Sequence, residues 1–456
     1  MSITPTSPAV PDSDQRRPSG PDTGRRGRIG LVLAGSMAAG LLAALLFVAA
    51  PVVPAKDSEV VGAVLCGFAL GWALLAMLSV RFTDQPQRWA VVPALFMGLS
   101  GLLLVLFGSR VDDVLKWVWP PALLVLAIWM AVRVGRELHS RGGRWLLYPV
   151  IAILALASIG GGYETAREAA DAKAYPPPGQ LIDVGGHSLH LNCTGSGSPT
   201  VVLEAGGGEM SSNLGWITPA VSGTTRVCVY DRAGRGWSES ADAAQDGKQI
   251  ATDLRTLLHR GNVPGPYVLA GHSFGGLYVR TFAASYPDEV AGMVLVDSTA
   301  AKSSAGSPAD PASYDPIGRV SALVSASARV GLVRLYNQVS FESLPPRSRD
   351  EVRATGATAS NLRSTIDEYV QANSSMEQAA AFKDFAGKPL VVLTAGSGND
   401  AAWQAKQKDL AGLSTNSSQR IVRGASHEAL VGNEEYAAAT TQAILDVVSA
   451  VRSPTR

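Results

Sequence analysis

Charged residues are scarce in this sequence, and their signs are almost balanced. Asp, Glu, Lys and Arg make up only 17% of the 456 residues, and the formal net charge is +1. This balance gives no indication of a nucleic-acid partner, because nucleic acids are bound mainly through an excess of positive charge. So low a content of charged residues is unusual for a soluble protein and predicts membrane segments.

The sequence also lacks the common nucleotide and metal motifs. It contains no cluster with metal-ligand spacing, no Walker loop and no dinucleotide-binding fingerprint. We therefore expect chemistry that needs no metal and no cofactor.

Five apolar stretches in the first third of the chain are almost free of ionisable residues. Four reach the length of about 20 residues that a helix needs to cross a bilayer, and the fifth is marginal. None has the polar face of a helix in a soluble core, and transport paths often carry ionisable groups that are missing here. The stretches cover about residues 29–50, 59–80, 89–109, 114–134 and 145–162.

These stretches divide the chain. We predict a disordered polar tail over residues 1–28, a transmembrane region of about five helices over 29–162 and a linker over 163–179. The linker reads as a short polar helix that ends in the hinge Pro176–Pro178.

Basic residues are concentrated in the tail and in the loops after the second and fourth stretches. By the positive-inside rule this places the N-terminus in the cytoplasm of a multi-pass cell-membrane protein, and five crossings place everything after Tyr163 outside. Arg110 and Lys116 in the third loop weaken the count, and only four crossings would leave the rest of the chain in the cytoplasm. Outside the cytoplasm, Cys193 and Cys228 are candidates for a disulfide, the alternative being two buried thiols.

From residue 180 onward, short β-rich runs alternate with helical patterns. This alternation predicts an α/β fold with a mostly parallel, eight-stranded sheet covered by helices on both faces. About 90 mainly helical residues separate the sixth and seventh runs, and we interpret residues 299–388 as a lid. The runs are 180–186, 187–195, 200–206, 225–231, 267–273, 291–297, 389–396 and 419–426.

A candidate nucleophile lies between the fifth run and the next helical pattern. Residues Gly271–Gly275 have the G-x-S-x-G pattern, with Ser273 at its centre. A sharp strand-to-helix turn exposes such a serine near a base and near the free N–H groups of the helix N-terminus. We therefore predict that Ser273 is a catalytic nucleophile.

The base and the acid should follow the serine in the order acid, then histidine. His427 is the only one of six histidines after Ser273. Asp297 and Asp400 are both candidates for the acid that orients the imidazole. The usual position, after the seventh strand, favours Asp400, but its turn is long. We prefer Asp297, which ends the sixth strand directly, and keep Asp400 as the alternative.

Two backbone N–H groups should hold the oxyanion that forms during acyl transfer. Phe274, directly after the nucleophile, supplies one. The segment Ala205–Glu209 contains three successive glycines that allow close approach to a substrate. We choose Gly207 as the second donor, with Gly208 as the fallback.

The segments GHSFGG, YDRAGRGWS, YPDEVAGMVLVDS and GASH together resemble the α/β-hydrolase superfamily over about 280 residues, especially its bacterial lipase/esterase-like and haloperoxidase-like members. The resemblance implies the strand order 1-2-4-3-5-6-7-8. Strands two and four are then neighbours, which implies a bridge between Cys193 and Cys228. Dehalogenases and epoxide hydrolases of this fold use an aspartate nucleophile, so Ser273 disfavours those activities.

We therefore expect a membrane-anchored serine hydrolase that cleaves carboxylic esters, with a lipid-like or small acyl ester as its substrate. The lid favours a partly apolar acyl chain because a helical cover makes a dry cavity. An acyltransferase and a catalytically silent membrane sensor or scaffold are the alternatives. The expected partners are the ester and the membrane, without nucleic acid, and the oligomeric state stays open.

Overall fold

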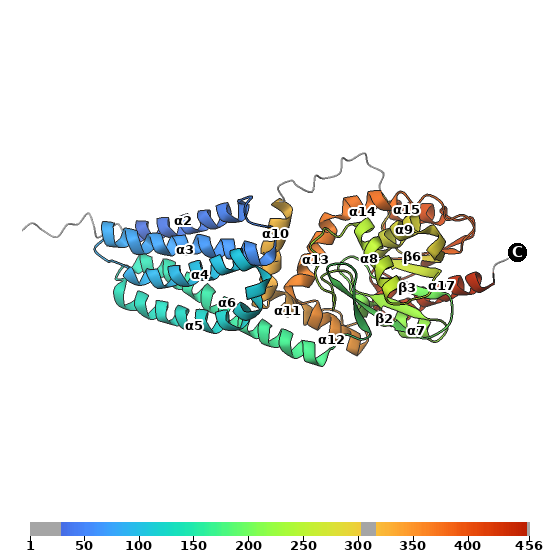
Figure 1. Cartoon of the computed structure of the whole chain (residues 1–456), viewed down its shortest axis with the longest axis horizontal. Coiled ribbons are helices and arrows are strands. Elements are labelled where there is room, and N and C mark those ends of the chain that lie inside the picture. Colours follow the sequence, from blue (N-terminus) through green and yellow to red (C-terminus); the bar gives the residue numbers. More distant parts are fainter. Residues whose placement is uncertain (1–28, 302–315, 454–456) are drawn as a thin grey trace, which may run out of the picture.

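The computed structural model describes residues 29–301 and 316–453. A bundle of long helices lies at one end of an elongated molecule, and an α/β domain lies at the other (Figure 1). The predicted polar tail lies outside the described residues.

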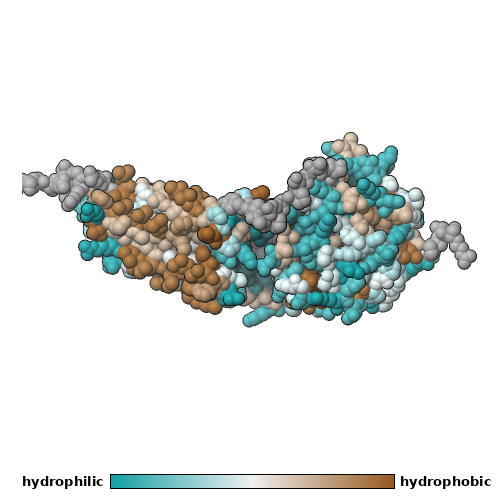
Figure 2. All heavy atoms as spheres, turned by 45° about the horizontal axis from the view of Figure 1, so that its top comes forward, coloured by the Kyte–Doolittle hydropathy of each residue, from teal (hydrophilic) through white to brown (hydrophobic). Residues whose placement is uncertain are grey.

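All five apolar stretches form helices that are long and apolar enough to cross a membrane. Small residues let these helices approach closely, as expected where there is no hydrophobic driving force between them: a Cβ built on Gly67 would lie 2.2 Å from the backbone nitrogen of Ala44. On the face shown in Figure 2, hydrophobic side chains cover the bundle, whereas the α/β domain is mainly hydrophilic. The helices are α2 (Ile29–Ala49), α3 (Asp57–Phe82), α4 (Val91–Phe107), α5 (Ser109–Glu137) and α6 (Arg141–Ala174), with the short η1 (Arg88–Ala90) before α4.

Helix α6 runs without a break through residue 162, where we predicted the boundary between the membrane region and the linker. Helix α6 continues to Ala174, just before Pro176–Pro178. The polar segment after residue 162 is rich in Ala and Glu, which are good helix formers, so nothing ends the helix before the prolines. The third loop is also shorter than expected, because Gly108 alone separates α4 from α5.

The eight predicted runs form one sheet in the order β1-β2-β4-β3-β5-β6-β7-β8, which confirms the expected fold. The β1–β2 and β2–β4 pairs are antiparallel, and the remaining pairs are parallel. The strands are β1 (Gln180–Asp183), β2 (Ser188–Thr194), β3 (Thr200–Glu204), β4 (Val227–Tyr230), β5 (Tyr267–His272), β6 (Val290–Val296), β7 (Leu390–Ala395) and β8 (Ser417–Val422).

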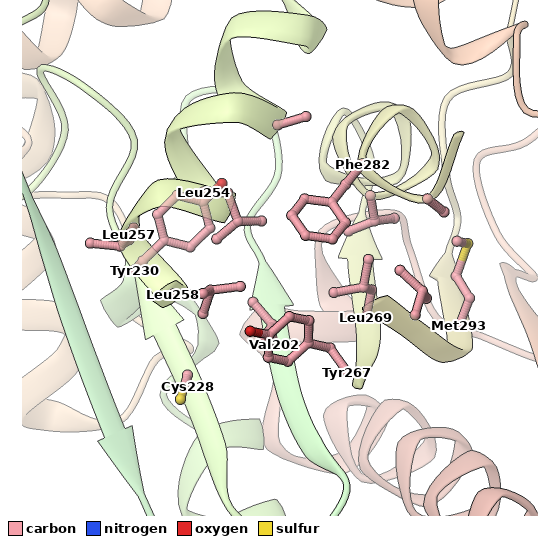
Figure 3. Packing of buried hydrophobic residues seen from close by; sticks show 14 of the residues in the cluster. Val202, Cys228, Tyr230, Leu254, Leu257, Leu258, Tyr267, Leu269, Phe282 and Met293 are labelled. Carbon is pink, nitrogen blue, oxygen red and sulfur yellow. The ribbon is translucent and has the colours of Figure 1, made fainter. Parts of the chain in front are cut away.

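Helices cover both faces of the sheet, which is why its central strands are apolar throughout. On one face, Leu254 of α8 (Gly247–Arg260) and Phe282 of α9 (Gly275–Ser285) pack over Leu269 (Figure 3). On the other face lie α7 (Ile217–Ser222) and α17 (Glu434–Arg452).

Cys193 and Cys228 form a disulfide. They face each other in the register of the antiparallel β2–β4 pair, with their Cα atoms 4.0 Å apart. The bridge that the resemblance implied is therefore confirmed.

From residue 316 onward, the predicted lid segment between β6 and β7 is mostly helical. Most of these helices lie between the bundle and the sheet, whereas the last one packs against α8 and α9 (Figure 1). They are α10 (Pro316–Ser325), η4 (Ala326–Val330), α11 (Leu332–Asn337), α12 (Pro346–Thr355), α13 (Ala359–Val370) and α14 (Ala372–Ala379).

Candidate active site

Ser273 occupies the sharp turn between β5 and α9. Its φ of 53° lies in the left-handed region, which is strained for a residue with a side chain. The flanking glycines make the turn possible: a Cβ on Gly271 would lie 2.6 Å from the backbone of Gly275, and one on Gly275 would lie 2.5 Å from the Glu204 carbonyl oxygen. The backbone N–H of Ser273 donates to the Val296 carbonyl at 3.0 Å, which fixes the turn against β6.

Asp297, at the end of β6, holds His427. The imidazole Nδ1 lies 2.6 Å from Asp297 Oδ2 and donates to it, since an ionised carboxylate only accepts. The buried carboxylate also accepts from the indole N–H of Trp403 at 2.9 Å and from the backbone N–H of Ala395 at 3.1 Å. Burial alone would raise the pKa of Asp297, but these hydrogen bonds outweigh it and lower the pKa below its ordinary value.

Asp400, the alternative acid, has a different position. It is the N-cap of helix α15 (Ala401–Ala411), and its side chain accepts from the backbone N–H of Trp403 at 2.7 Å. Of the two candidates, Asp297 is therefore the one that contacts His427.

Ser273 and His427 line the same cavity, which has a volume of about 910 Å³. The lid supplies much of its apolar wall, including Leu332 on α11, Val352 on α12 and Leu362 on α13. The structure thus brings the predicted nucleophile and base to one cavity with a partly apolar lining.

The predicted oxyanion donors Gly207 and Phe274 are neighbours, and Gly207 lines the cavity. A Cβ built on Gly207 would lie only 3.0 Å from the ring of Phe274. Within the described part of the chain, neither the N–H of Gly207 nor that of Phe274 donates a hydrogen bond. The fallback residue differs, because the N–H of Gly208 donates to Glu368 at 3.0 Å.

A buried ionic network beneath the glycine loop was missed from the sequence. Arg232 bridges Glu204 and Glu368, at 2.6 Å each, and Arg235 contacts Glu368 at 2.7 Å. Arg232 also donates to the Gly206 carbonyl at 2.7 Å, which orients the loop. The arginines lie in the quoted segment YDRAGRGWS, but nothing in the lid sequence marked Glu368 as their partner.

Burial and the neighbouring arginines shift the pKa values of these carboxyl groups in opposite directions. Burial raises the pKa of Glu204 to about 7, although Arg232 acts in the opposite direction. Burial would also raise the pKa of Glu368, but Arg232 and Arg235 outweigh it and lower the pKa. Glu368 is therefore held as an anion that ties helix α13 to the loop.

A second interaction that the sequence did not predict holds His427, the predicted base, in place. His272 Nδ1 lies 3.0 Å from Glu209 Oε2, and its Nε2 lies 3.1 Å from the backbone carbonyl of His427. Both partners are acceptors, so both ring nitrogens of His272 donate. Burial would lower the pKa of His272, but the charge and hydrogen bond of Glu209 outweigh it and raise the pKa. His272, which directly precedes Ser273 in the G-x-S-x-G pattern, thus fixes the backbone of His427.

Comparisons with known proteins agree with this architecture. A family described as "alpha/beta hydrolase fold" matches residues 199–433. An uncharacterized protein of Schizosaccharomyces pombe is 33% identical over 154 residues, which are 27% of this chain and 29% of that protein. An uncharacterized vacuolar membrane protein of Saccharomyces cerevisiae is 31% identical over 132 residues, 25% of this chain and 20% of that protein. The chain thus spans less than a third of the length of these two relatives.

Among solved structures, the enol-lactonase from Burkholderia xenovorans is 20% identical, with a TM-score of 0.45. The alignment covers 59% of this chain and 100% of that one.

Proposed function

Because the chain belongs to the alpha/beta hydrolase fold family, we propose that it is a membrane-anchored serine hydrolase that cleaves carboxylic esters. The observation that carries the proposal is the contact of 2.6 Å between His427 and Asp297 at a cavity that also contains Ser273, raised on a strained turn. Its five helices that are long and apolar enough to cross a membrane support the membrane anchor.

The proposed reaction is acyl transfer to Ser273 and then to water. His427 takes the proton of the Ser273 hydroxyl while the oxygen attacks the ester carbonyl, and Asp297 stabilises the imidazolium. The N–H groups of Gly207 and Phe274 hold the oxyanion. The C–O bond to the leaving alcohol breaks, and His427 passes its proton to that alcohol. Water, activated by His427, then releases the acid and restores the serine.

The apolar wall of the cavity supports a substrate with an acyl chain. A cavity of about 910 Å³ lined by Leu332, Val352 and Leu362 can take a chain of several carbons. Ser273 and His427 line the same cavity, where the ester group of such a substrate would meet them.

We also propose that the N-terminus is cytoplasmic and that the hydrolase domain lies outside the cytoplasm. Helix α2 begins at the end of the bundle far from the hydrolase domain (Figure 1), the end at which Arg141 and Arg144 also lie. The disulfide between Cys193 and Cys228 supports an oxidising compartment for the other end.

Covalent labelling tests the proposed nucleophile. A fluorophosphonate probe should label the unmodified full-length protein and should fail to label Ser273→Ala. Ser426→Ala is a matched control, because Ser426 lines the same cavity, and it should be labelled normally. Absence of labelling in the unmodified protein, or labelling that persists in Ser273→Ala, would overturn the proposal.

A further inference from the structure

The lid is fixed to the membrane bundle as well as to the sheet. Four lid arginines contact the bundle, and two of them, Arg319 and Arg334, are buried. Arg319 donates to two backbone carbonyls at 2.6 Å each. Val48 lies in the last turn of α2 and Val53 lies just beyond it, where free carbonyls need donors. The ion pairs are Arg329–Asp112 at 2.7 Å, Arg334–Glu164 at 2.7 Å and Arg363–Asp57 at 2.9 Å.

The lid meets α6 where the apolar part of that helix ends. A Cβ built on Gly160 would lie 2.3 Å from the carbonyl oxygen of Val330, so only glycine allows η4 to pack here. The segment from Trp145 to Tyr163 is roughly 27 Å long at the rise of an α-helix, close to the thickness of the hydrocarbon core of about 30 Å. Tyr163 is a half-exposed aromatic residue of the kind that marks the interface. Helix η4 therefore lies at the boundary of the hydrocarbon.

At this level the lid exposes apolar side chains. Ile317, Val320 and Val324 form one stripe along α10, with exposed fractions of 55%, 58% and 47%. Helix α10 lies across the ends of the bundle helices (Figure 1). Leu335 on α11 and Val339 just after it are 61% and 78% exposed. Exposed apolar groups on helices next to membrane spans are typical of an element that lies in the interface.

The rim of the Ser273 cavity lies at the same level. Leu332 and Tyr336 of α11 line the cavity and are nevertheless 57% and 70% exposed, so they stand at its opening. Leu332 follows Gly331, where a built Cβ would lie 3.7 Å from the carbonyl oxygen of Gly160. The opening is therefore beside the membrane surface.

We propose that the substrate is an acyl ester of a bilayer lipid, which enters the cavity laterally past Leu332 and Tyr336 without leaving the membrane. This inference rests on the proposed function and adds its substrate class. The lipid chain slides along the apolar faces of α10 and α11, and its ester carbonyl reaches Ser273. Cleavage yields a free fatty acid and the deacylated lipid alcohol.

Contact between the lid and the bilayer can be measured without any activity. In full-length protein carrying Cys66→Ser, we would label Leu335→Cys or Val339→Cys with a bimane fluorophore and reconstitute the protein in phosphatidylcholine vesicles. The matched control is Ile421→Cys on the edge strand β8, which is 52% exposed. Brominated acyl chains should quench the labels at 335 and 339 and leave the label at 421 unchanged. Equal quenching at all three positions, or at none, would overturn the inference.

Activity then tests the substrate class. Leu335→Glu and Val339→Glu should lower fatty-acid release from phosphatidylcholine or diacylglycerol vesicles about tenfold or more, because apolar contact with the chain is lost. Hydrolysis of soluble p-nitrophenyl butyrate should stay within about twofold, and Ile421→Glu should change neither rate. Equal losses on the soluble and the vesicle ester would overturn the inference. An unmodified protein that cleaves only the soluble ester would overturn the substrate class alone, and one that cleaves neither would overturn the proposed function as well.

Discussion

The sheet side and the lid side of the cavity are held in place by different interactions. On the sheet side, Ser273, Asp297 and His427 follow strand ends, and hydrogen bonds within the α/β domain fix them. On the lid side, Glu368 holds α13 to the sheet through buried ion pairs, and further ion pairs hold the lid to the bundle. The sheet side is thus built for rigid geometry, whereas the lid side depends on charge pairs that differ widely in burial.

The two aspartates give the largest expected contrast. Asp297→Asn should lower kcat by about 10⁴, because the amide stabilises the wrong imidazole tautomer and cannot balance its positive charge. Asp400→Asn should leave kcat within a few-fold, since Asn is also a good N-cap for α15. Steady-state hydrolysis of a soluble ester measures both, and equal losses would remove the distinction between the two residues.

Glu368→Gln should have the next largest effect. It leaves Arg232 and Arg235 buried without their shared anion, which costs about 3–5 kcal/mol of folding free energy. Chemical unfolding of the detergent-solubilised protein measures this loss. The matched control is Glu342→Gln, which removes an exposed lid carboxylate paired with Arg353. A result for Glu368→Gln as small as that of the control would show that the buried network does not hold the lid.

Loss of the disulfide should destabilise the sheet side alone. The bridge between Cys193 and Cys228 closes a loop across 35 positions, which corresponds to about 3–4 kcal/mol by loop-closure entropy. The double variant Cys193→Ser, Cys228→Ser should lower the unfolding temperature of the α/β domain and leave the helical signal of the bundle in place. Simultaneous loss of both signals would mean that the two regions unfold as one unit.

Removing an exposed ion pair should have the smallest effect on stability. Lys56 and Asp242 lie 2.7 Å apart but are largely exposed, so Lys56→Ala should change stability by less than about 1 kcal/mol. Arg334→Ala removes a buried partner of Glu164 and Asp171 and should cost several-fold more. Thermal unfolding of both variants measures the ratio, and a ratio near one would contradict the role of burial.

The sequence predicted most of the sheet side because its signals are local. Eight apolar runs, a G-x-S-x-G turn and a single late histidine were enough to place the strands, Ser273 and His427. The acid was harder to predict, because the turns after β6 and β7 lie near each other. Only three-dimensional packing shows that Asp400 caps α15 and that Asp297 reaches the imidazole of His427.

Most interactions on the lid side could not be predicted from the sequence. Glu368 and its arginines are more than 130 positions apart, and no periodicity marks such a pair. The packing of Gly160 against η4 is also long-range, and the sequence did not indicate it. Helix α6 passed the predicted boundary because helix propensity continues where hydropathy stops.

The acyl-enzyme is the central claim, and mass spectrometry of a quenched reaction tests it most directly. Full-length protein mixed with a p-nitrophenyl ester and quenched with acid during turnover should carry one acyl group on the peptide that contains Ser273. Asp297→Asn should accumulate this adduct more slowly, and Ser273→Ala should not form it. An acyl group on another residue, or turnover that continues in Ser273→Ala, would contradict the account.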